Sequence, residues 1–264
     1  MGNQPAHRAR KRFGQNFLHD PGIIQRIVQT ISPQPGDNLV EIGPGQGAIT
    51  TELLHLVKQM HAIELDRDLV EPLAARCATL GEIQIHNTDA LKFNFSSLAE
   101  TDRPLRVVGN LPYNISTPLL FHLLDQSASI SDMHFMLQKE VVDRMGADPG
   151  SKSYGRLSVM LQARAAVSPL FSIGPGAFNP PPKVESAFVR LQPYDSSPYR
   201  IDNWENFSHV VSQAFSQRRK TLRNCLKQTL SADAIKSVGI DPGLRAESLS
   251  VENFATLARL VTGR

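Results

Sequence analysis

A short apolar segment that leads into a glycine-rich loop constrains the fold of this chain more than any other feature. Residues 38–42 read Asn-Leu-Val-Glu-Ile, the loop runs from Gly43 to Gly47, and a helical pattern follows from Ala48 to Val57. A short apolar segment bounded by turn residues is typical of a buried strand. Glycines between a strand and a helix let a ligand approach the backbone closely. We therefore predict a strand–loop–helix unit with a ligand site at its turn.

Similar apolar segments recur along the chain. The further expected strands lie at residues 59–66, 82–86, 105–109, 130–137, 166–171 and 184–191, and a helix is expected from Gly155 to about Ala165. Strands that alternate with helices favour a parallel sheet with helices on both faces, and the last two strands are expected to form a hairpin that completes it. The sequence therefore predicts an α/β fold with a mostly parallel, seven-stranded sheet.

The chain changes character after a break at residues 193–198, which is rich in proline and serine. Such a stretch is typical of a linker. From about residue 202 onward the pattern is helical, with no strand-like segment. We predict a large domain over residues 1–195 and a small all-α domain over residues 200–264.

Acidic residues follow two neighbouring strands. Glu64 lies near the end of the second expected strand, 21 residues after Gly43, and Asp89 follows the third. A carboxylate in the first position can accept both hydroxyls of a ribose, and one in the second can accept a hydrogen bond from an adenine amine. We therefore predict that a ligand containing adenosine binds at this edge of the sheet.

Two cofactors are compatible with the glycine loop. Gly43, Gly45 and Ala48 match the dinucleotide fingerprint, which permits alanine at its last position. Glu41, however, begins a Glu-x-Gly-x-Gly-x-Gly pattern that is typical of S-adenosylmethionine sites, and Asp89 adds a second acidic strand end. These residues favour S-adenosylmethionine, with a nicotinamide dinucleotide as the alternative.

The tetrapeptide Asn110-Leu111-Pro112-Tyr113 follows the fourth expected strand. The side-chain oxygen of Asn110 and the carbonyl of Pro112 can both accept hydrogen bonds from one exocyclic amine, and the ring of Tyr113 offers a face for a base. This set indicates methyl transfer to the amino group of adenine. The structural alternative is a plain turn in which Asn110 caps the helix expected near Ser116.

Taken in order along the chain, these and several further segments resemble the ribosomal RNA adenine dimethyltransferases. The matching segments are Arg12 to Leu18, Glu41 to Thr50, Glu64 to Asp68, Asp89-Ala90, Asn110 to Ser116, Phe178 to Ser186, Gln217 to Arg223 and Val238 to Pro242. The match extends from about Arg8 to about Leu260, and no motif position departs from the pattern. Within this group the chain is similar to the bacterial KsgA/RsmA family.

The resemblance implies a Rossmann-like S-adenosylmethionine-dependent methyltransferase sheet of seven strands, one of them antiparallel, and a small helical domain that binds rRNA. It implies S-adenosylmethionine as the methyl donor. The target would be two adjacent adenosines in the 3′-terminal hairpin of 16S rRNA, within the small ribosomal subunit or its precursor. Each adenosine would receive two methyl groups, and a role in small-subunit biogenesis would follow.

The same resemblance assigns roles to individual residues. The donor site would consist of Asn16, Leu18, Gly43, Gly45, Glu64, Asp89 and Asn110. Asn110, Leu111 and Pro112 would orient the target amine. Tyr113 would stack on one face of the adenine, and Phe178 would close on the other. Without the resemblance, Phe178 reads as a core residue.

Basic residues gather in two clusters, although the net charge is only +3. One lies within residues 1–12, and the other consists of Arg218, Arg219, Lys220, Arg223 and Lys227. We expect the second cluster to lie on one helix, where residues 219, 223 and 227 form a stripe because they are four positions apart. Such a stripe can contact RNA phosphates. The alternative is a solvated helix face.

Composition limits the other classes of function. The hydrophobic content of 41% and charged content of 20% are ordinary for a soluble globular protein, and no apolar run is long enough to span a bilayer. The basic N-terminus lacks the apolar region of a secretory signal. Cys77 and Cys225 lie far apart without metal-ligand neighbours. We therefore predict a cytoplasmic monomer that binds neither a metal nor a membrane.

Two further functions stay open at this point. An adenine methyltransferase that acts on DNA would use the same tetrapeptide logic, but the helical C-terminal region and the segment from Phe178 to Ser186 disfavour it. A non-catalytic factor that binds ribosome precursors is disfavoured by the intact donor-site positions. An assay with duplex DNA tests the first alternative, and donor binding tests the second.

Overall fold

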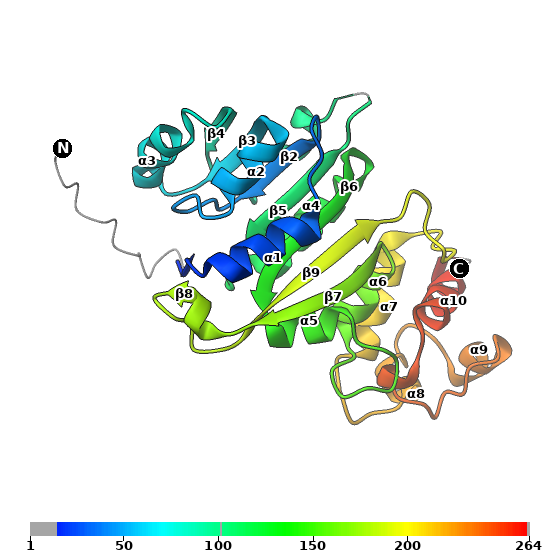
Figure 1. Cartoon of the computed structure of the whole chain (residues 1–264). Coiled ribbons are helices and arrows are strands. Elements are labelled where there is room, and N and C mark those ends of the chain that lie inside the picture. Colours follow the sequence, from blue (N-terminus) through cyan, green and yellow to red (C-terminus); the bar gives the residue numbers. More distant parts are fainter. Residues whose placement is uncertain (1–14, 101, 263–264) are drawn as a thin grey trace. The chain divides into compact units, whose positions relative to one another are not determined.

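The computed structural model describes residues 15–100 and 102–262 (Figure 1). The basic segment predicted within residues 1–12 lies outside the described residues. Seven strands form one sheet: β2 (Asn38–Ile42), β3 (Gln59–Glu64), β4 (Glu82–Asn87), β5 (Leu105–Asn110), β6 (Ile130–Gln138), β7 (Ala165–Ile173) and β9 (Ser186–Pro193). Two short strands, β1 (Phe17–Leu18) and β8 (Phe178–Asn179), form a separate antiparallel pair.

The large sheet is mostly parallel, with the order β4-β3-β2-β5-β6-β9-β7. Parallel pairs join β4 to β3, β3 to β2, β2 to β5 and β5 to β6. Strand β9 runs antiparallel to β6, with Phe188 opposite Met136. The predicted α/β sheet of seven mostly parallel strands is therefore confirmed.

The carboxyl ends of the parallel strands meet at one edge of the sheet. There β2 leads into Gly43, β3 ends at Glu64, β4 ends at Asn87 and β5 ends at Asn110. The strand order reverses between β2 and β5, and ligands of such sheets bind outside the carboxyl ends at this reversal. The topology thus brings together site segments that are far apart in the sequence.

Helices connect the strands and form most of the C-terminal region. They are α1 (Pro21–Ile31), α2 (Thr50–Val57), α3 (Arg67–Cys77), α4 (Ser116–Leu124), α5 (Lys139–Met145), α6 (Arg156–Gln162), α7 (Trp204–Ala214), α8 (Leu222–Cys225), α9 (Ala232–Ser237) and α10 (Val251–Thr262). Helix α1 starts where the side chain of Asp20 accepts a hydrogen bond from Ile23 N at 2.9 Å. No helix within the described ranges is long and apolar enough to cross a membrane.

The chain divides into two compact units. Of the described residues, the first unit contains those up to Lys139 and Ser168–Pro193. The second unit contains Glu140–Val167 and the described residues from Tyr194 onward. Residues 140–167 thus group with the C-terminal helices, and the domains expected over residues 1–195 and 200–264 stay a prediction. Hydrogen bonds tie this segment to the C-terminal region, among them one from the Tyr154 hydroxyl to the carbonyl of Leu249 at 2.8 Å.

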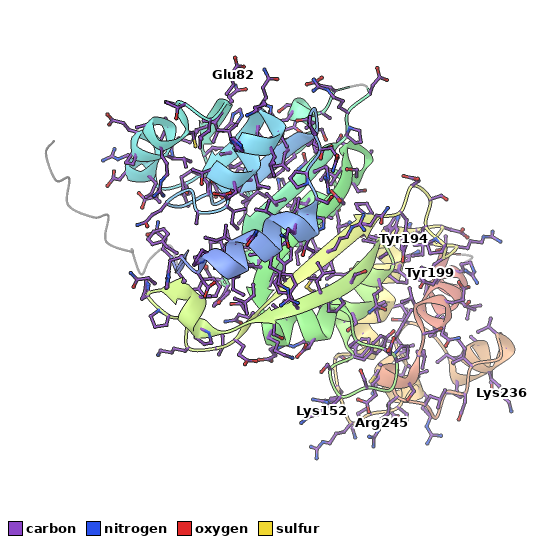
Figure 2. All side chains as sticks on the ribbon, in the orientation of Figure 1. Glu82, Lys152, Tyr194, Tyr199, Lys236 and Arg245 are labelled. Atoms are coloured by element: carbon purple, nitrogen blue, oxygen red, sulfur yellow. The ribbon has the colours of Figure 1, made fainter. Side chains whose placement is uncertain are left out.

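The second unit lacks the long basic helix that the sequence pattern predicted. Helix α7 ends at Ala214, and α8 spans only Leu222–Cys225. The N–H groups of Leu222 and Arg223 donate to main-chain carbonyls of the segment 242–244, so a tertiary contact interrupts the helical periodicity. The predicted stripe of residues 219, 223 and 227 on one helix was therefore wrong. Other cations of this unit, such as Lys152 and Arg245, project into solvent (Figure 2).

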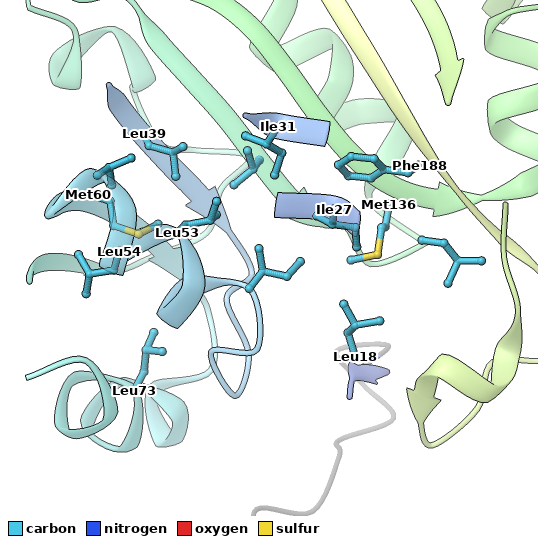
Figure 3. Close-up of a cluster of buried hydrophobic side chains, with 14 of the residues drawn as sticks. Leu18, Ile27, Ile31, Leu39, Leu53, Leu54, Met60, Leu73, Met136 and Phe188 are labelled. Carbon is cyan, nitrogen blue, oxygen red and sulfur yellow. The ribbon is translucent and has the colours of Figure 1, made fainter. Parts of the chain in front are cut away.

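Helices α1, α2 and α3 cover one face of the sheet in the first unit (Figure 3). Their buried side chains and those of the strands include Ile27, Ile31, Leu53, Leu54, Leu73, Leu39, Met60, Met136 and Phe188. Burial of apolar surface of this kind is the main stabilising contribution to such a fold. Leu18 of β1 and Phe178 of β8 belong to the same cluster, which anchors the short strand pair to the core of the unit.

A largely buried ion-pair network lies at the opposite edge of the sheet, where the strands begin. The guanidinium of Arg106 on β5 makes two hydrogen bonds of 2.9 Å to the carboxylate of Asp132 on β6. It also donates to Asp37, just before β2, at 2.6 Å and to the carbonyl of Ile31 in α1 at 2.7 Å. Only 17% of the Arg106 side chain and 7% of the Asp132 side chain are exposed. The network joins four segments at the edge remote from the strand ends that carry the site.

Candidate active site

A pocket of the first unit lies at the carboxyl edge of the sheet. Its wall is formed by the segment before α1, the loop after β2, the ends of β3 and β4, and the loop after β5. Of the residues predicted for the site, it contains Asn16, Leu18, Gly43, Gly45, Glu64, Asp89, Asn110, Leu111, Pro112 and Tyr113. Folding therefore places these predicted residues around one pocket, with Phe178 as the exception.

The loop after β2 passes close to other parts of the pocket wall. Gly43 and Gly45 have φ angles of 68° and 57°, in the left-handed region that glycine adopts without strain. A Cβ atom on Gly45 would lie 3.1 Å from ring carbons of Phe17, and one on Gly43 would lie 3.7 Å from the carbonyl oxygen of Asn110. Glycine at these positions thus permits the left-handed turn, and at Gly45 it also permits the close approach of the Phe17 ring.

Glu64 is a buried carboxylate whose orientation is set by the backbone. Its Oε1 accepts a hydrogen bond from Asp66 N at 2.7 Å, and its Oε2 accepts one from Gly45 N at 3.2 Å. Burial raises the pKa of this carboxyl group, and the two backbone hydrogen bonds oppose that rise. Each oxygen keeps a further lone pair, so the carboxylate can accept the two hydroxyls of a ribose.

The charge of the pocket favours a cationic ligand. Asp89 accepts a hydrogen bond from Leu91 N through Oδ1 at 3.0 Å, which leaves Oδ2 for another donor. Glu64 contributes a second carboxylate, and no lysine, arginine or histidine occurs among the described residues that line the pocket. This charge suits the positive S-adenosylmethionine better than the anionic pyrophosphate of a dinucleotide.

Glu41 has the most deeply buried carboxyl group of the pocket wall, at 2% exposure, and its Oε2 has no hydrogen-bond partner among the described residues. Burial raises the pKa of Glu41 from 4.5 to about 7, the Thr50 side chain opposes the rise, and the charge of Glu64 adds to it. The folded state therefore favours the protonated form. The stability linked to this proton is present at low pH and is lost as the pH rises from about 4.5 through about 7.

We expect Glu41→Gln to weaken this pH dependence, because glutamine is neutral at every pH. Without a ligand, the variant and the wild type should be similarly stable near pH 4.5, and the variant should be the more stable at pH 8, by up to about 3 kcal/mol. Chemical denaturation across this range measures the difference. The exposed Glu52→Gln serves as the control and should follow the wild type. An identical pH dependence in Glu41→Gln and wild type would contradict the expectation.

The side-chain amide of Asn110 is oriented by the segment before α1. Its Nδ2 donates to the carbonyl oxygen of Asn16 at 3.0 Å. This bond assigns the nitrogen of the amide to Asn16 and leaves Oδ1 as an acceptor. Helix α4 has no side-chain cap, since its N-cap residue is Ile115. The alternative reading, in which Asn110 caps this helix, is therefore excluded.

Leu111 and Pro112 hold the loop after β5 in place. The side chain of Leu111 is buried, and its N–H donates to the carbonyl of Met136 on β6 at 3.2 Å. The Pro112 carbonyl accepts a hydrogen bond from Ile115 N at 3.2 Å. A carbonyl oxygen has two lone pairs, so this second predicted acceptor keeps one for an amine.

Tyr113 is held at its main chain and at its hydroxyl. Its carbonyl accepts a hydrogen bond from the Ser116 hydroxyl at 3.2 Å, and its own hydroxyl lies 2.9 Å from Oγ of Ser186 on β9. The ring is half-buried and lines the pocket. It therefore offers an aromatic surface next to Asn110 and Pro112.

Phe178 does not line this pocket. It pairs with Leu18 in the short sheet of β1 and β8, is 3% exposed, and packs in the cluster that contains Phe188. In this structure its ring belongs to the hydrophobic core, and its contact with a target adenine stays a prediction.

Several residues of the pocket wall were missed by the sequence reasoning. The side chain of Gln15 donates to Asp66 at 3.1 Å, the ring of Phe17 lies against Gly45, and Leu65 is 51% exposed beside Glu64. The position of Leu65 directly after the acidic strand end was a usable signal. Gln15 and Phe17 lie within the segment Arg12 to Leu18 that carries the family resemblance, but only the path of this segment before α1 shows that they reach the glycine loop.

The parallel sheet with one antiparallel neighbour of β6, the glycine turn after β2 and the carboxylates after β3 and β4 define an S-adenosylmethionine-dependent methyltransferase. The pocket satisfies the needs of that donor: a glycine turn in its wall, an oriented carboxylate for the ribose and acidic groups around a cation.

Comparison with known proteins narrows this class. A model of the ribosomal RNA adenine dimethylase family matches residues 6–262, and the chain belongs to that family. The ribosomal RNA small subunit methyltransferase A of Nitrosococcus oceani is 57% identical, and the match covers 97% of this chain and 97% of that protein. The protein of the same name from Marinobacter nauticus is 54% identical, and the match covers 99% of this chain and 94% of that protein. A dimethyladenosine transferase from Plasmodium falciparum has a similar structure, with a TM-score of 0.79 at 26% identity over 91% of this chain and 95% of its own. The resemblance drawn from the sequence motifs is thus confirmed.

Proposed function

We propose that this protein transfers methyl groups from S-adenosylmethionine to the N6 amines of two adjacent adenosines in the 3′-terminal hairpin of 16S rRNA, giving N6,N6-dimethyladenosine. Family membership supports the reaction, and the name of the similar proteins, ribosomal RNA small subunit methyltransferase A, supports the target. The observation that carries the proposal is the Asn110 amide, because its bond to Asn16 leaves the side-chain oxygen as an acceptor in the pocket wall.

The donor supplies a methyl group that is already activated by a positive sulfonium. In our proposal Glu64 binds its ribose hydroxyls, Asp89 binds its adenine amine, and Gly43 and Gly45 allow it to approach the backbone. The segment containing Asn16 and Leu18 adds to the same wall.

The residues after β5 would prepare the acceptor. The N6 amine of adenine is a weak nucleophile because its lone pair is delocalised into the ring. Hydrogen bonds from its N–H groups to Asn110 Oδ1 and the Pro112 carbonyl would localise that lone pair, while Tyr113 would stack on the base. Orientation then supplies much of the acceleration. A strong base is not required before transfer, because the proton becomes acidic only after the nitrogen has gained its methyl group.

Incubation with labelled S-adenosylmethionine and unmethylated small ribosomal subunits tests the proposal. The RNA would be digested and its nucleosides identified by mass spectrometry, and N6,N6-dimethyladenosine is the expected product. Label in duplex DNA in place of rRNA would favour a DNA methyltransferase. Donor binding without label in either nucleic acid would favour a non-catalytic assembly factor. We place the reaction in the cytoplasm, where small subunits mature, and assign it to a monomer.

The exposed cations of the second unit are the proposed contacts for RNA phosphates. They are Arg218, Arg219, Lys220, Arg223 and Lys227. The side chain of Arg218 donates to the carbonyl of Lys152 at 3.2 Å, which brings a further exposed cation to the cluster. Arg245, next to the segment that pairs with α8, is exposed as well. This cationic surface is built from several turns of one unit, and sequence periodicity could not reveal Lys152 or Arg245 as parts of it.

Reversing the charge of Arg219, Arg223 and Lys227 to glutamate should weaken RNA binding and spare donor binding. Each lost phosphate contact lowers the slope of log affinity against log salt by roughly one, so a decrease of about three is expected. Filter binding at several salt concentrations measures it. The control reverses the exposed cations Arg67, Lys92 and Lys236, which lie outside this surface. An unchanged salt slope in the first variant would refute the assignment.

A further inference from the structure

The hydroxyl–hydroxyl contact between Tyr113 and Ser186 joins the proposed stacking residue to a strand of the sheet. The two oxygens lie 2.9 Å apart, and the residues are 73 positions apart in the chain. Tyr113 belongs to the loop after β5, whereas Ser186 is the first residue of β9. Both residues belong to the first unit.

Ser186 is held in a fixed position by the sheet. It is 1% exposed and lies opposite Gln138 in the antiparallel pairing of β6 and β9. The carbonyl of the preceding residue, Glu185, accepts a hydrogen bond from Lys139 N at 2.9 Å. A buried hydroxyl requires a hydrogen-bond partner, and the Tyr113 hydroxyl provides it.

The ring of Tyr113 needs such an anchor. Its χ1 has three staggered wells, so local geometry alone does not hold a half-buried ring in one place. Stacking depends on the angle and offset between two aromatic planes. A bond from the hydroxyl at the far end of the ring to a strand restricts the offset, because it fixes where that end of the ring lies.

We infer that Ser186 is a positioning residue for the reaction, which anchors the Tyr113 hydroxyl and holds the ring in the place where the target adenine stacks. The inference rests on the proposed function, in which Tyr113 is the stacking residue. Ser186 does not line the pocket and acts through Tyr113. Tyrosine is thus required at position 113 for its hydroxyl as well as for its ring.

A double-mutant cycle of Ser186→Ala and Tyr113→Phe tests this inference. Single-turnover methylation of small subunits should slow about fivefold in each single variant, the factor expected for loss of one hydrogen bond, with donor affinity unchanged. The double variant should be no slower than either single variant, because both changes remove the same bond. Additive losses, or a Ser186→Ala variant as fast as wild type, would overturn the inference. A much larger loss in Tyr113→Phe than in Ser186→Ala would do the same, since the hydroxyl would then act on the substrate directly.

Fluorine NMR of protein labelled with 3-fluorotyrosine tests the anchor without RNA. The chain has four tyrosines, and the signal of Tyr113 is identified by its absence in Tyr113→Phe. Ser186→Ala should change the shift and width of this signal. Ser131→Ala is the control, because it removes a serine hydroxyl that donates to the Leu105 carbonyl at 3.1 Å near the other end of β6. An unchanged Tyr113 signal in Ser186→Ala refutes the anchor, whereas a wild type that does not methylate small subunits refutes the proposed function alone.

Discussion

Replacing Asn110 with alanine is expected to lower the rate of methyl transfer by about 10³-fold, the effect of losing one preorganised hydrogen-bonding group at a reacting centre. The substitution removes Oδ1, which we propose accepts a hydrogen bond from the target amine, and also the Nδ2 that donates to Asn16. The Pro112 carbonyl alone cannot localise the lone pair of the amine in the same way. Single-turnover methylation of unmethylated small subunits measures the loss.

The controls for Asn110→Ala separate chemistry from binding. RNA affinity should stay near that of the wild type, because the cationic surface belongs to the second unit. Asn94→Ala, at an exposed asparagine of the first unit whose side chain makes no capping bond, should keep full activity. Asn110→Asp keeps an acceptor oxygen but loses the group that donates to Asn16, so its rate of methyl transfer should fall between those of the wild type and Asn110→Ala. Near-wild-type methylation by Asn110→Ala would show that the amine-orienting role is wrong.

Replacing Asp132 with alanine is expected to lower the free energy of unfolding by about 3 kcal/mol, the cost of breaking a buried ion pair from one side. The guanidinium of Arg106 would lose its two hydrogen bonds to this carboxylate while staying largely buried. Its remaining partners would be Asp37 and the carbonyls of Ile31 and Ser32. Urea denaturation of the ligand-free protein measures the change.

The matched control for Asp132→Ala is Glu100→Ala, which breaks the ion pair of Glu100 with Arg103. About half of each side chain in that pair is exposed, at 55% and 47%, so the loss should be below about 1 kcal/mol. Donor affinity should be unchanged in both variants at temperatures where they are folded, because the network lies at the amino edge of the sheet and the pocket at the carboxyl edge. Similar destabilisation by the two variants would mean that burial does not strengthen the Arg106 network.

The succession of strands along the chain and the edge of the sheet that carries the site were predictable from short-range patterns. The apolar segment before Gly43 and the acid at Glu64 follow the spacing of successive parallel strands, and parallel strands place their carboxyl ends at one edge. The placement of Asp89 and Asn110 around the same pocket follows from this rule alone. Local spacing was sufficient to predict this edge, because each strand–helix unit places its strand in the sheet in the same direction.

Contacts between distant segments were not predictable in this way. The helix expected through Arg219, Arg223 and Lys227 is interrupted because main-chain groups of Leu222 and Arg223 pair with the segment 242–244. The grouping of residues 140–167 with the C-terminal helices likewise depends on bonds such as that of Tyr154 to Leu249. A periodic pattern indicates which face of a helix or strand is apolar, but not which other element will pack against that face.

The sequence by itself determined the class of fold, the family and the residue types proposed for the donor site, because short segments of the chain encode them. Only the tertiary structure decided how Asn110 is oriented, what anchors Tyr113 and where Phe178 lies. Asn16 meets Asn110 across 94 positions and Ser186 meets Tyr113 across 73, and both contacts exist only because the sheet brings their strands and loops together. The physical reason is that a hydrogen bond depends on distance and angle in space, whereas sequence motifs specify only the groups that are available to form it.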